Sequence, residues 1–164
     1  MTFNKKLVII SVLGLVVFLF DRFLKYVFLQ GHEYTLINDV LSFKIFGNTG
    51  IAFGIRFVDW IFYILVVVIL VFLIYFIVKF FKKKQVFQVG VLWFVILGAA
   101  SNLIDRVRYG YVVDYIDFWK WSVFNVADIM IVVSILVFFG IMFKETKPAS
   151  AIASADNKLT KKSK

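Results

Sequence analysis

The chain has 164 residues, of which 62% are hydrophobic and 20% aromatic, with a formal net charge of +9. Because soluble domains use roughly 45–50% apolar residues, this composition indicates an integral membrane protein. The basic residues gather beside the apolar segments, as membrane orientation requires, so no nucleic-acid partner is expected. The absence of cysteine and the presence of one histidine exclude disulfides, thiolate metal sites, a cysteine nucleophile and a two-histidine metal site.

Four apolar segments predict an all-α membrane protein with four spanning helices, at about residues 7–29, 60–78, 86–104 and 124–143. The second segment is an unbroken apolar run close to the roughly 20 residues that cross a bilayer. The first could be a cleaved signal peptide, because its apolar run is short and follows two lysines. However, Asp21 and Arg22 stand where a small-residue cleavage site is expected, which favours a retained helix.

Lysine and arginine lie mostly in the N-terminus, around residues 79–84 and in the C-terminal tail, so both termini are expected in the cytoplasm. Four crossings then place residues 31–59 and the connection before the fourth helix outside, together with the polar ends of three helices. The unusual polar residues therefore converge on the extracytoplasmic face. We expect one membrane-embedded domain over residues 1–147 and a disordered, basic cytoplasmic tail over 148–164.

The external segment 31–59 contains charges and is not another span. Alternation over residues 41–46 predicts one or two short strands, with a turn at Gly47 and Asn48. We expect a small β-sheet on the bilayer surface. The spacing of Gly47, Gly50 and Gly54 further predicts that this segment acts as a mobile lid.

Four aspartates lie where an apolar chain holds charge least easily: Asp105, Asp114, Asp117 and Asp128. If the fourth helix starts at Phe124, Asp128 lies roughly 6 Å below its start, desolvated yet close to water. Asp114 precedes it in an external connection that can fold back. Two carboxylates held together cannot easily both ionise, so the pair predicts a general acid and a general base.

Helical spacing places Gly98, Asn102 and Arg106 on one stripe at the outer end of the third helix. Gly98 and the neighbouring Asp105 also have structural interpretations. Gly98 is typical of a close helix-packing surface, and the charge of Asp105 can be compensated by its neighbour Arg106.

Similar alternatives apply nearer the N-terminus. Asp21 and Lys25 have the spacing of an i, i+4 ion pair, which is a structural feature of many helices. Asn48 is either a turn residue before Gly50 or a substrate contact.

Five blocks together resemble the bacterial lipoprotein signal peptidases, the type II signal peptidases of aspartyl peptidase family A8. The blocks are Asp21-x-x-x-Lys25, Asn48–Phe53, Gly98–Arg106, Val112–Tyr115 and Phe124–Asp128. They occur in order from the first helix to the fourth, so the resemblance spans the chain except for the C-terminal tail. Three positions depart from the family pattern, with Ser101 in place of a glycine, Ile51 in place of an alanine and Tyr115 in place of a phenylalanine.

The resemblance implies an intramembrane endopeptidase of the bacterial inner membrane that cuts diacylglyceryl prolipoproteins before the lipidated cysteine. Asp114 and Asp128 would form the catalytic dyad, without a cofactor or metal. Substrate contacts and dyad orientation would come from Asn48, Asn102, Arg106 and Asn125. Structural support would come from Asp21, Lys25, Gly50, Gly98 and Asp105. Expected partners are prolipoproteins and membrane lipids, and the chain is expected to be a monomer.

Three other functions stay open at this point. Intramembrane carboxylates also mark a small proton-coupled transporter or channel subunit, although these charges gather at one face and the second helix carries none. A noncatalytic lipid-binding or scaffold protein would pair its aspartates with Arg106 and Arg108. A serine hydrolase would use Ser101 and Lys25.

Overall fold

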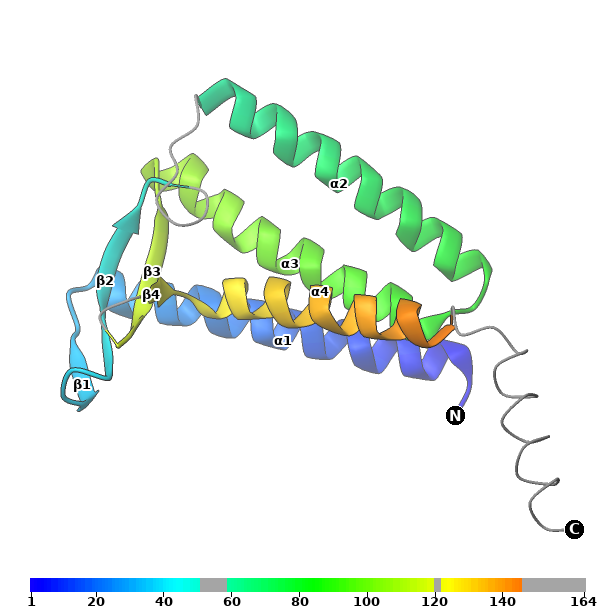
Figure 1. Ribbon diagram of the computed structural model, residues 1–164, viewed down its shortest axis with the longest axis horizontal. Helices are drawn as coiled ribbons and strands as arrows, with labels where there is room; N and C mark the ends of the chain where they lie inside the picture. Colours follow the sequence, from blue (N-terminus) through cyan, green and yellow to red (C-terminus); the bar gives the residue numbers. More distant parts are fainter. Residues whose placement is uncertain (51–58, 120–121, 146–164) are drawn as a thin grey trace, which may run out of the picture.

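The computed structural model describes residues 1–50, 59–119 and 122–145. Within them, four long helices end in a four-stranded antiparallel sheet at one end of the bundle (Figure 1). The predicted tail at 148–164 and Gly54 of the predicted lid lie outside the described residues. The boundary at residue 147 therefore stays a prediction.

The helices are α1 (Phe3–Leu29), α2 (Asp59–Lys82), α3 (Val86–Tyr109) and α4 (Val126–Glu145). All four are long and apolar enough to cross a membrane, so the four predicted spans are confirmed. The fourth helix was expected to begin at Phe124, and this is wrong because Phe124 belongs to a strand. Asp128 accordingly lies in the first turn of α4, nearer the helix end than expected.

The strands are β1 (Tyr34–Ile37), β2 (Leu41–Asn48), β3 (Val112–Phe118) and β4 (Ser122–Phe124), in the spatial order β1-β2-β3-β4. The predicted small sheet is therefore confirmed. Its third and fourth strands were not anticipated, because the connection that carries them was read only as a loop that folds back.

The turn predicted at Gly47 and Asn48 is wrong. These residues end β2, where they pair with Val113 and Val112 of β3, so a tertiary contact overrides the local turn preference. The chain turns instead between β1 and β2, where Asp39 adopts a positive φ of 61°.

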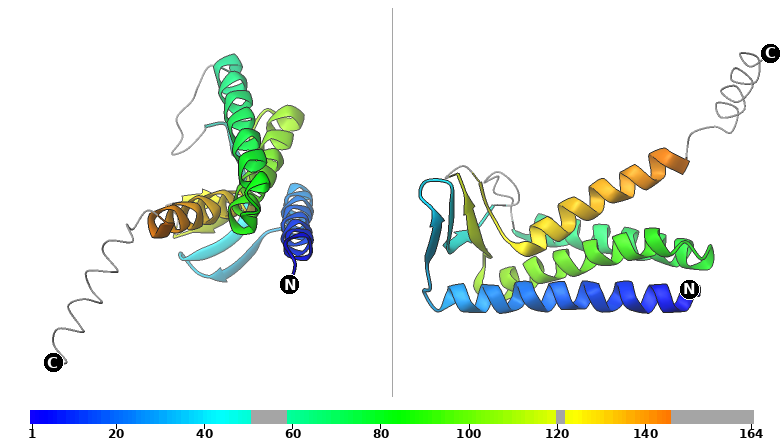
Figure 2. Two further views of the ribbon diagram at one scale, coloured as in Figure 1. Left: turned by 90° about the vertical axis from the view of Figure 1, so that its right-hand side faces the viewer. Right: turned by 90° about the horizontal axis from the view of Figure 1, so that it is seen from below.

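Helix α3 lies at the centre of the bundle and packs against the other three helices. Helix α1 runs beside α3, whereas α4 leans away from both toward its C-terminal end (Figure 2). Helix α2 meets α3 at the end far from the sheet, where Phe80, Val89 and Leu92 form a buried apolar cluster. The N-terminus and the end of α4 lie at that same end (Figure 1).

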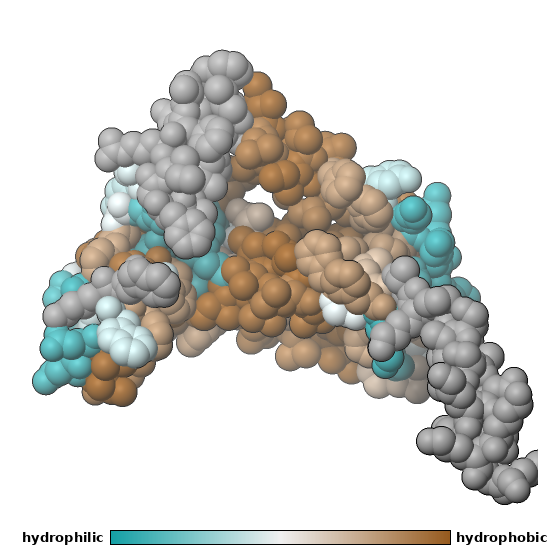
Figure 3. Space-filling view, in the orientation of Figure 1, coloured by the Kyte–Doolittle hydropathy of each residue, from teal (hydrophilic) through white to brown (hydrophobic). Residues whose placement is uncertain are grey.

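Hydropathy follows the same division of the molecule. Apolar side chains cover the middle of the molecule, and polar residues gather at the sheet and at the opposite end (Figure 3). Most side chains described on α2 are exposed and apolar, as expected for a helix that faces lipid. Among the described residues, the buried charged side chains gather at the end of the bundle where α1, α3 and α4 meet the sheet.

Candidate active site

Asp114 on β3 and Asp128 in the first turn of α4 are joined by one asparagine. The side-chain N–H of Asn125 donates to Asp114 Oδ1 at 2.7 Å, and its Oδ1 accepts the backbone N–H of Asp128 at 2.9 Å. The backbone N–H of Asn125 donates in return to Asp128 Oδ2 at 3.2 Å. Asn125 thus forms a reciprocal capping box with Asp128 and also holds the carboxylate of Asp114.

Two further asparagines bind the outer oxygens of the two carboxylates. Asn48 Nδ2 donates to Asp114 Oδ2 at 2.9 Å, and Asn102 Nδ2 donates to Asp128 Oδ1 at 2.8 Å. Both amides are oriented by a donor on their oxygen, since Gly50 N–H donates to Asn48 at 3.0 Å and Lys25 Nζ donates to Asn102 at 2.8 Å. Because a lysine ammonium only donates, it fixes the Asn102 nitrogen toward Asp128.

Burial sets the protonation of the strand carboxyl. Asp114 is 1% exposed. Burial raises the pKa of its carboxyl from 3.8 to about 6, the hydrogen bond from Asn48 opposes this rise, and the nearby charge of Asp128 adds to it. Asp114 therefore holds its proton at a pH where a free aspartate has lost it.

Beneath the dyad lies a cluster of fully buried charges from α1 and α3. Lys25 Nζ lies 2.7 Å from Asp105 Oδ2 and 3.3 Å from Asp21 Oδ2, so the expected ion pair between Lys25 and Asp21 is present. The charge of Asp105 is compensated from α1, because Arg22 also pairs with it at 2.5 Å. Nothing in the sequence pattern distinguished Arg22 as a partner of α3.

Ser101 and Lys25 do not form a hydrolase pair. The Ser101 hydroxyl is fully buried and donates to Asp21 Oδ2 at 2.6 Å. The Lys25 Nζ pairs instead with the carboxylates of Asp105 and Asp21.

The remaining predicted residues lie around the dyad. Arg106 donates to the carbonyl of Gly50, so the end of α3 contacts the chain just after β2. Gly98 packs closely on α4, since a Cβ atom at this position would lie 2.7 Å from the carbonyl oxygen of Ala127. This close approach supports its predicted role in helix packing.

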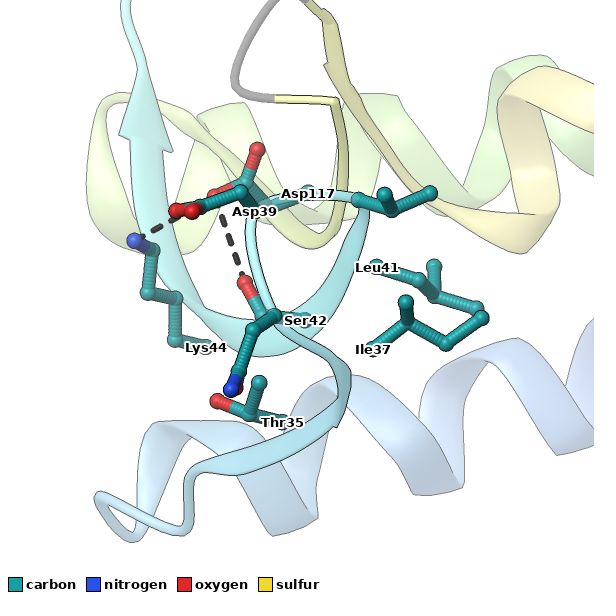
Figure 4. A pocket seen from close by; sticks show the side chains of 9 residues that line it. Thr35, Ile37, Asp39, Leu41, Ser42, Lys44 and Asp117 are labelled. Carbon is teal, nitrogen blue, oxygen red and sulfur yellow. Dashed lines mark hydrogen bonds and ion pairs between the residues drawn. The ribbon is translucent and has the colours of Figure 1, made fainter.

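Asp117 is separate from the dyad. It lines a polar cavity of about 350 Å³ beside the β1–β2 turn (Figure 4). Its carboxylate accepts a hydrogen bond from Ser42 at 3.3 Å and forms an ion pair with Lys44 at 3.2 Å.

Comparisons with known proteins point to one family. The family model described as signal peptidase (SPase) II matches residues 13–144. The chain belongs to the signal peptidase II family. It is 36% identical over 136 residues to a lipoprotein signal peptidase of Enterococcus faecalis, a match that covers 79% of this chain and 84% of that one. It is 39% identical over 118 residues to one of Clostridioides difficile, covering 68% and 77% of the two chains.

Solved structures agree with this assignment to signal peptidase II. A bacterial membrane enzyme determined by the in meso method at 2.3 Å resolution superposes with a TM-score of 0.72 at 30% identity, covering 84% of this chain and 89% of the other. A second such enzyme, determined at 1.9 Å, gives a TM-score of 0.68 at 31% identity, with 83% and 94% covered. The chain is therefore a multi-pass bacterial membrane protein and a protease.

Proposed function

We propose that this peptidase removes signal peptides from diacylglyceryl prolipoproteins by cutting on the amino side of the lipidated cysteine, with Asp114 and Asp128 as its catalytic dyad. Removal of signal peptides from prolipoproteins follows from the family. The observation that supports the dyad is the shared asparagine, because Asn125 donates to both carboxylates, through its side chain to Asp114 and through its backbone N–H to Asp128.

The chemistry needs only the two carboxyl groups and one water. The ionised member accepts a proton from water as the water oxygen attacks the scissile carbonyl carbon, and the protonated member hydrogen-bonds the carbonyl oxygen. As the tetrahedral intermediate collapses, the carbon–nitrogen bond breaks and a carboxyl proton passes to the leaving amine. The raised pKa of Asp114 makes it suited to hold a proton in this cycle.

The site lies where a lipid-anchored substrate can reach it. The dyad is at the sheet end of the bundle, at the start of α4. The distribution of lysine and arginine supports an orientation with this end on the extracytoplasmic side and both termini in the cytoplasm. A diacylglyceryl group can then stay in the lipid while the adjoining peptide bond meets water. One chain supplies all the residues of this site, so a monomer suffices.

The end of β2 and the residues directly after it, 47–50, are proposed to close over the peptide as a lid. Arg106 holds the Gly50 carbonyl and Asn48 holds Asp114, so this segment touches both α3 and the dyad. Because the chain has no cysteine, a cysteine pair can pin residues 47–50 to α3 without side reactions. Unchanged substrate entry and turnover in the pinned protein would contradict a moving lid.

The deciding experiment is cleavage of a synthetic diacylglyceryl prolipoprotein peptide by detergent-purified protein in the presence of a chelator. We expect a product that begins at the lipidated cysteine, identified by mass spectrometry. Asp114→Asn and Asp128→Asn should abolish it, whereas Ser101→Ala should retain it. Absence of cleavage by folded wild-type protein would contradict the proposal, and cation flux in proteoliposomes that depends on Asp128 would then indicate the transporter alternative.

A further inference from the structure

The first turn of α4 takes its hydrogen-bond acceptors from α1, from β3 and from the residue directly before the helix. The first backbone N–H groups of any helix have no partner within the helix. Here Asp128 N–H is accepted by Asn125, directly before the helix. Ala127 N–H donates to Asp21 Oδ1 of α1 at 3.1 Å, and Val126 N–H donates to the Tyr115 hydroxyl of β3 at 3.2 Å. Two of the three acceptors are therefore tertiary contacts.

The Tyr115 hydroxyl joins these two acceptors to each other. It accepts from Val126 and donates to Asp21 Oδ1 at 3.0 Å, and the whole side chain is 0% exposed. The ring stacks on Phe28 with centroids 5.1 Å apart and planes 12° from parallel, which fixes where the hydroxyl lies. Burial raises the pKa of Tyr115 above its ordinary value, so the hydroxyl keeps the proton that it donates.

We infer that the Tyr115 hydroxyl is a positioning group for Asp128, holding the start of α4 from outside the helix together with Asp21. The inference rests on the proposed role of Asp128. Val126 precedes Asp128 by two residues within the same turn, so a shift of its N–H moves the carboxyl. Asp114 lies on β3 and is held by Asn48 as well as by Asn125, so such a shift disturbs the link through Asn125 and changes the distance between the two carboxyl groups.

A phenylalanine at position 115 fills the same space without the hydroxyl. The ring can still stack on Phe28, but Val126 N–H then lacks its acceptor and Asp21 Oδ1 loses one of its two donors. Leaving such a buried group unpaired loosens the turn without removing either carboxyl of the dyad. Loss of the hydroxyl should therefore disturb the structure only at the start of α4 and should slow the chemical step of the reaction.

The test compares Tyr115→Phe with Ser101→Ala in the full-length protein. Ser101 donates to the other oxygen of the same carboxylate, Asp21 Oδ2, and this contact does not include α4. In Tyr115→Phe we expect kcat for the diacylglyceryl peptide to fall about tenfold while KM stays within about twofold. Amide hydrogen exchange should accelerate over residues 125–129 and stay unchanged in the later turns of α4. Ser101→Ala should change neither kcat nor this exchange.

The two readouts separate failure of this inference from failure of the proposed function. Unchanged exchange at 125–129 and unchanged kcat in Tyr115→Phe would overturn the positioning role. An equal loss of kcat in both variants, with an equal fall in unfolding temperature, would also overturn it, because it would show only general support through Asp21. If Asp128→Asn remained active, the catalytic assignment would fail, while the exchange result would still report on the cap of α4.

Discussion

The two ends of the helix bundle are held together by different forces. At the sheet end, buried charged and amide side chains of α1, α3, β3 and α4 bind one another, with Asp21, Lys25 and Asp105 at 0% exposure. At the opposite end, α2 and α3 meet through apolar side chains such as Phe80 and Leu92. Lipid tails are as apolar as these side chains, so apolar contacts alone specify helix positions weakly in a bilayer. The polar end therefore defines the site.

Breaking the charge cluster should have the largest effect on stability. Lys25→Met leaves Asp21 and Asp105 buried without their shared cation, and removing one partner of a buried pair costs about 3–5 kcal/mol. Thermal unfolding in detergent measures this loss. The control is Lys44→Met. The Lys44 side chain is 39% exposed, so its ion pair with Asp117 should contribute only about 0–1 kcal/mol to the free energy of unfolding. Equal losses in the two variants would contradict the importance of burial.

A methyl group on α3 should disturb the contact between the polar end and α4. In Gly98→Ala the new Cβ would lie 2.7 Å from the Ala127 carbonyl oxygen, and overpacking of this kind costs about 1–3 kcal/mol. A Cβ at Gly140, farther along α4, meets no atom within 4 Å, so Gly140→Ala should be neutral or stabilising by up to about 1 kcal/mol. The unfolding temperature and the peptide cleavage of the two variants measure this difference. A Gly98→Ala variant as stable and as active as the wild type would contradict the close contact between α3 and α4.

The raised pKa of Asp114 should appear as a pH-dependent cost in stability. Its carboxyl binds a proton more tightly when folded, with a pKa of about 6 instead of 3.8, so this group stabilises the fold less as the pH rises through that window. From pH 5 to pH 7 the loss from this group should be about 1 kcal/mol. Asp114→Asn removes the titration, so the stability difference between the variant and wild type should grow in the variant's favour over that range. A stability difference between variant and wild type that stays constant from pH 5 to pH 7 would contradict the raised pKa of Asp114.

The smallest effect is expected on the lipid-facing helix. The side chain of Val71 on α2 is 63% exposed, so Val71→Ala should change the free energy of unfolding by no more than about 0.5 kcal/mol. Leu92, which is 5% exposed in the apolar cluster, should give a larger loss when replaced by alanine. If Val71→Ala were as costly as Leu92→Ala, α2 would have a protein partner in the membrane.

The sequence predicted the parts of the molecule that depend on local patterns. Long apolar segments predicted the four helices, and alternation predicted β2. The turn at Gly47 and Asn48 failed because pairing with β3 decides the conformation there, and a local preference carries no information about that pairing. The predicted start of α4 at Phe124 is two residues early, because apolar residues stand on both sides of the boundary between β4 and the helix.

Within the site, the sequence identified the carboxylates and asparagines but not their bonding. Spacing placed Asn102 on the correct face of α3, yet only the fold shows that Lys25 orients its amide. Tyr115 was noted only as a departure from the family pattern. A hydroxyl among the buried valines of β3 was the available signal, and its partners on α1 and α4 are too distant in sequence to be inferred from spacing.

The most direct test of the dyad is whether its members act as a unit. We would measure kcat for the diacylglyceryl peptide in Asp114→Asn, in Asp128→Asn and in the double variant, with folding checked by thermal unfolding. Residues that act together show strongly non-additive losses, so each single variant should lose about a thousandfold or more and the double variant no more than either single one. Substantial activity in either single variant, or losses that multiply in the double variant, would contradict the shared-proton pair.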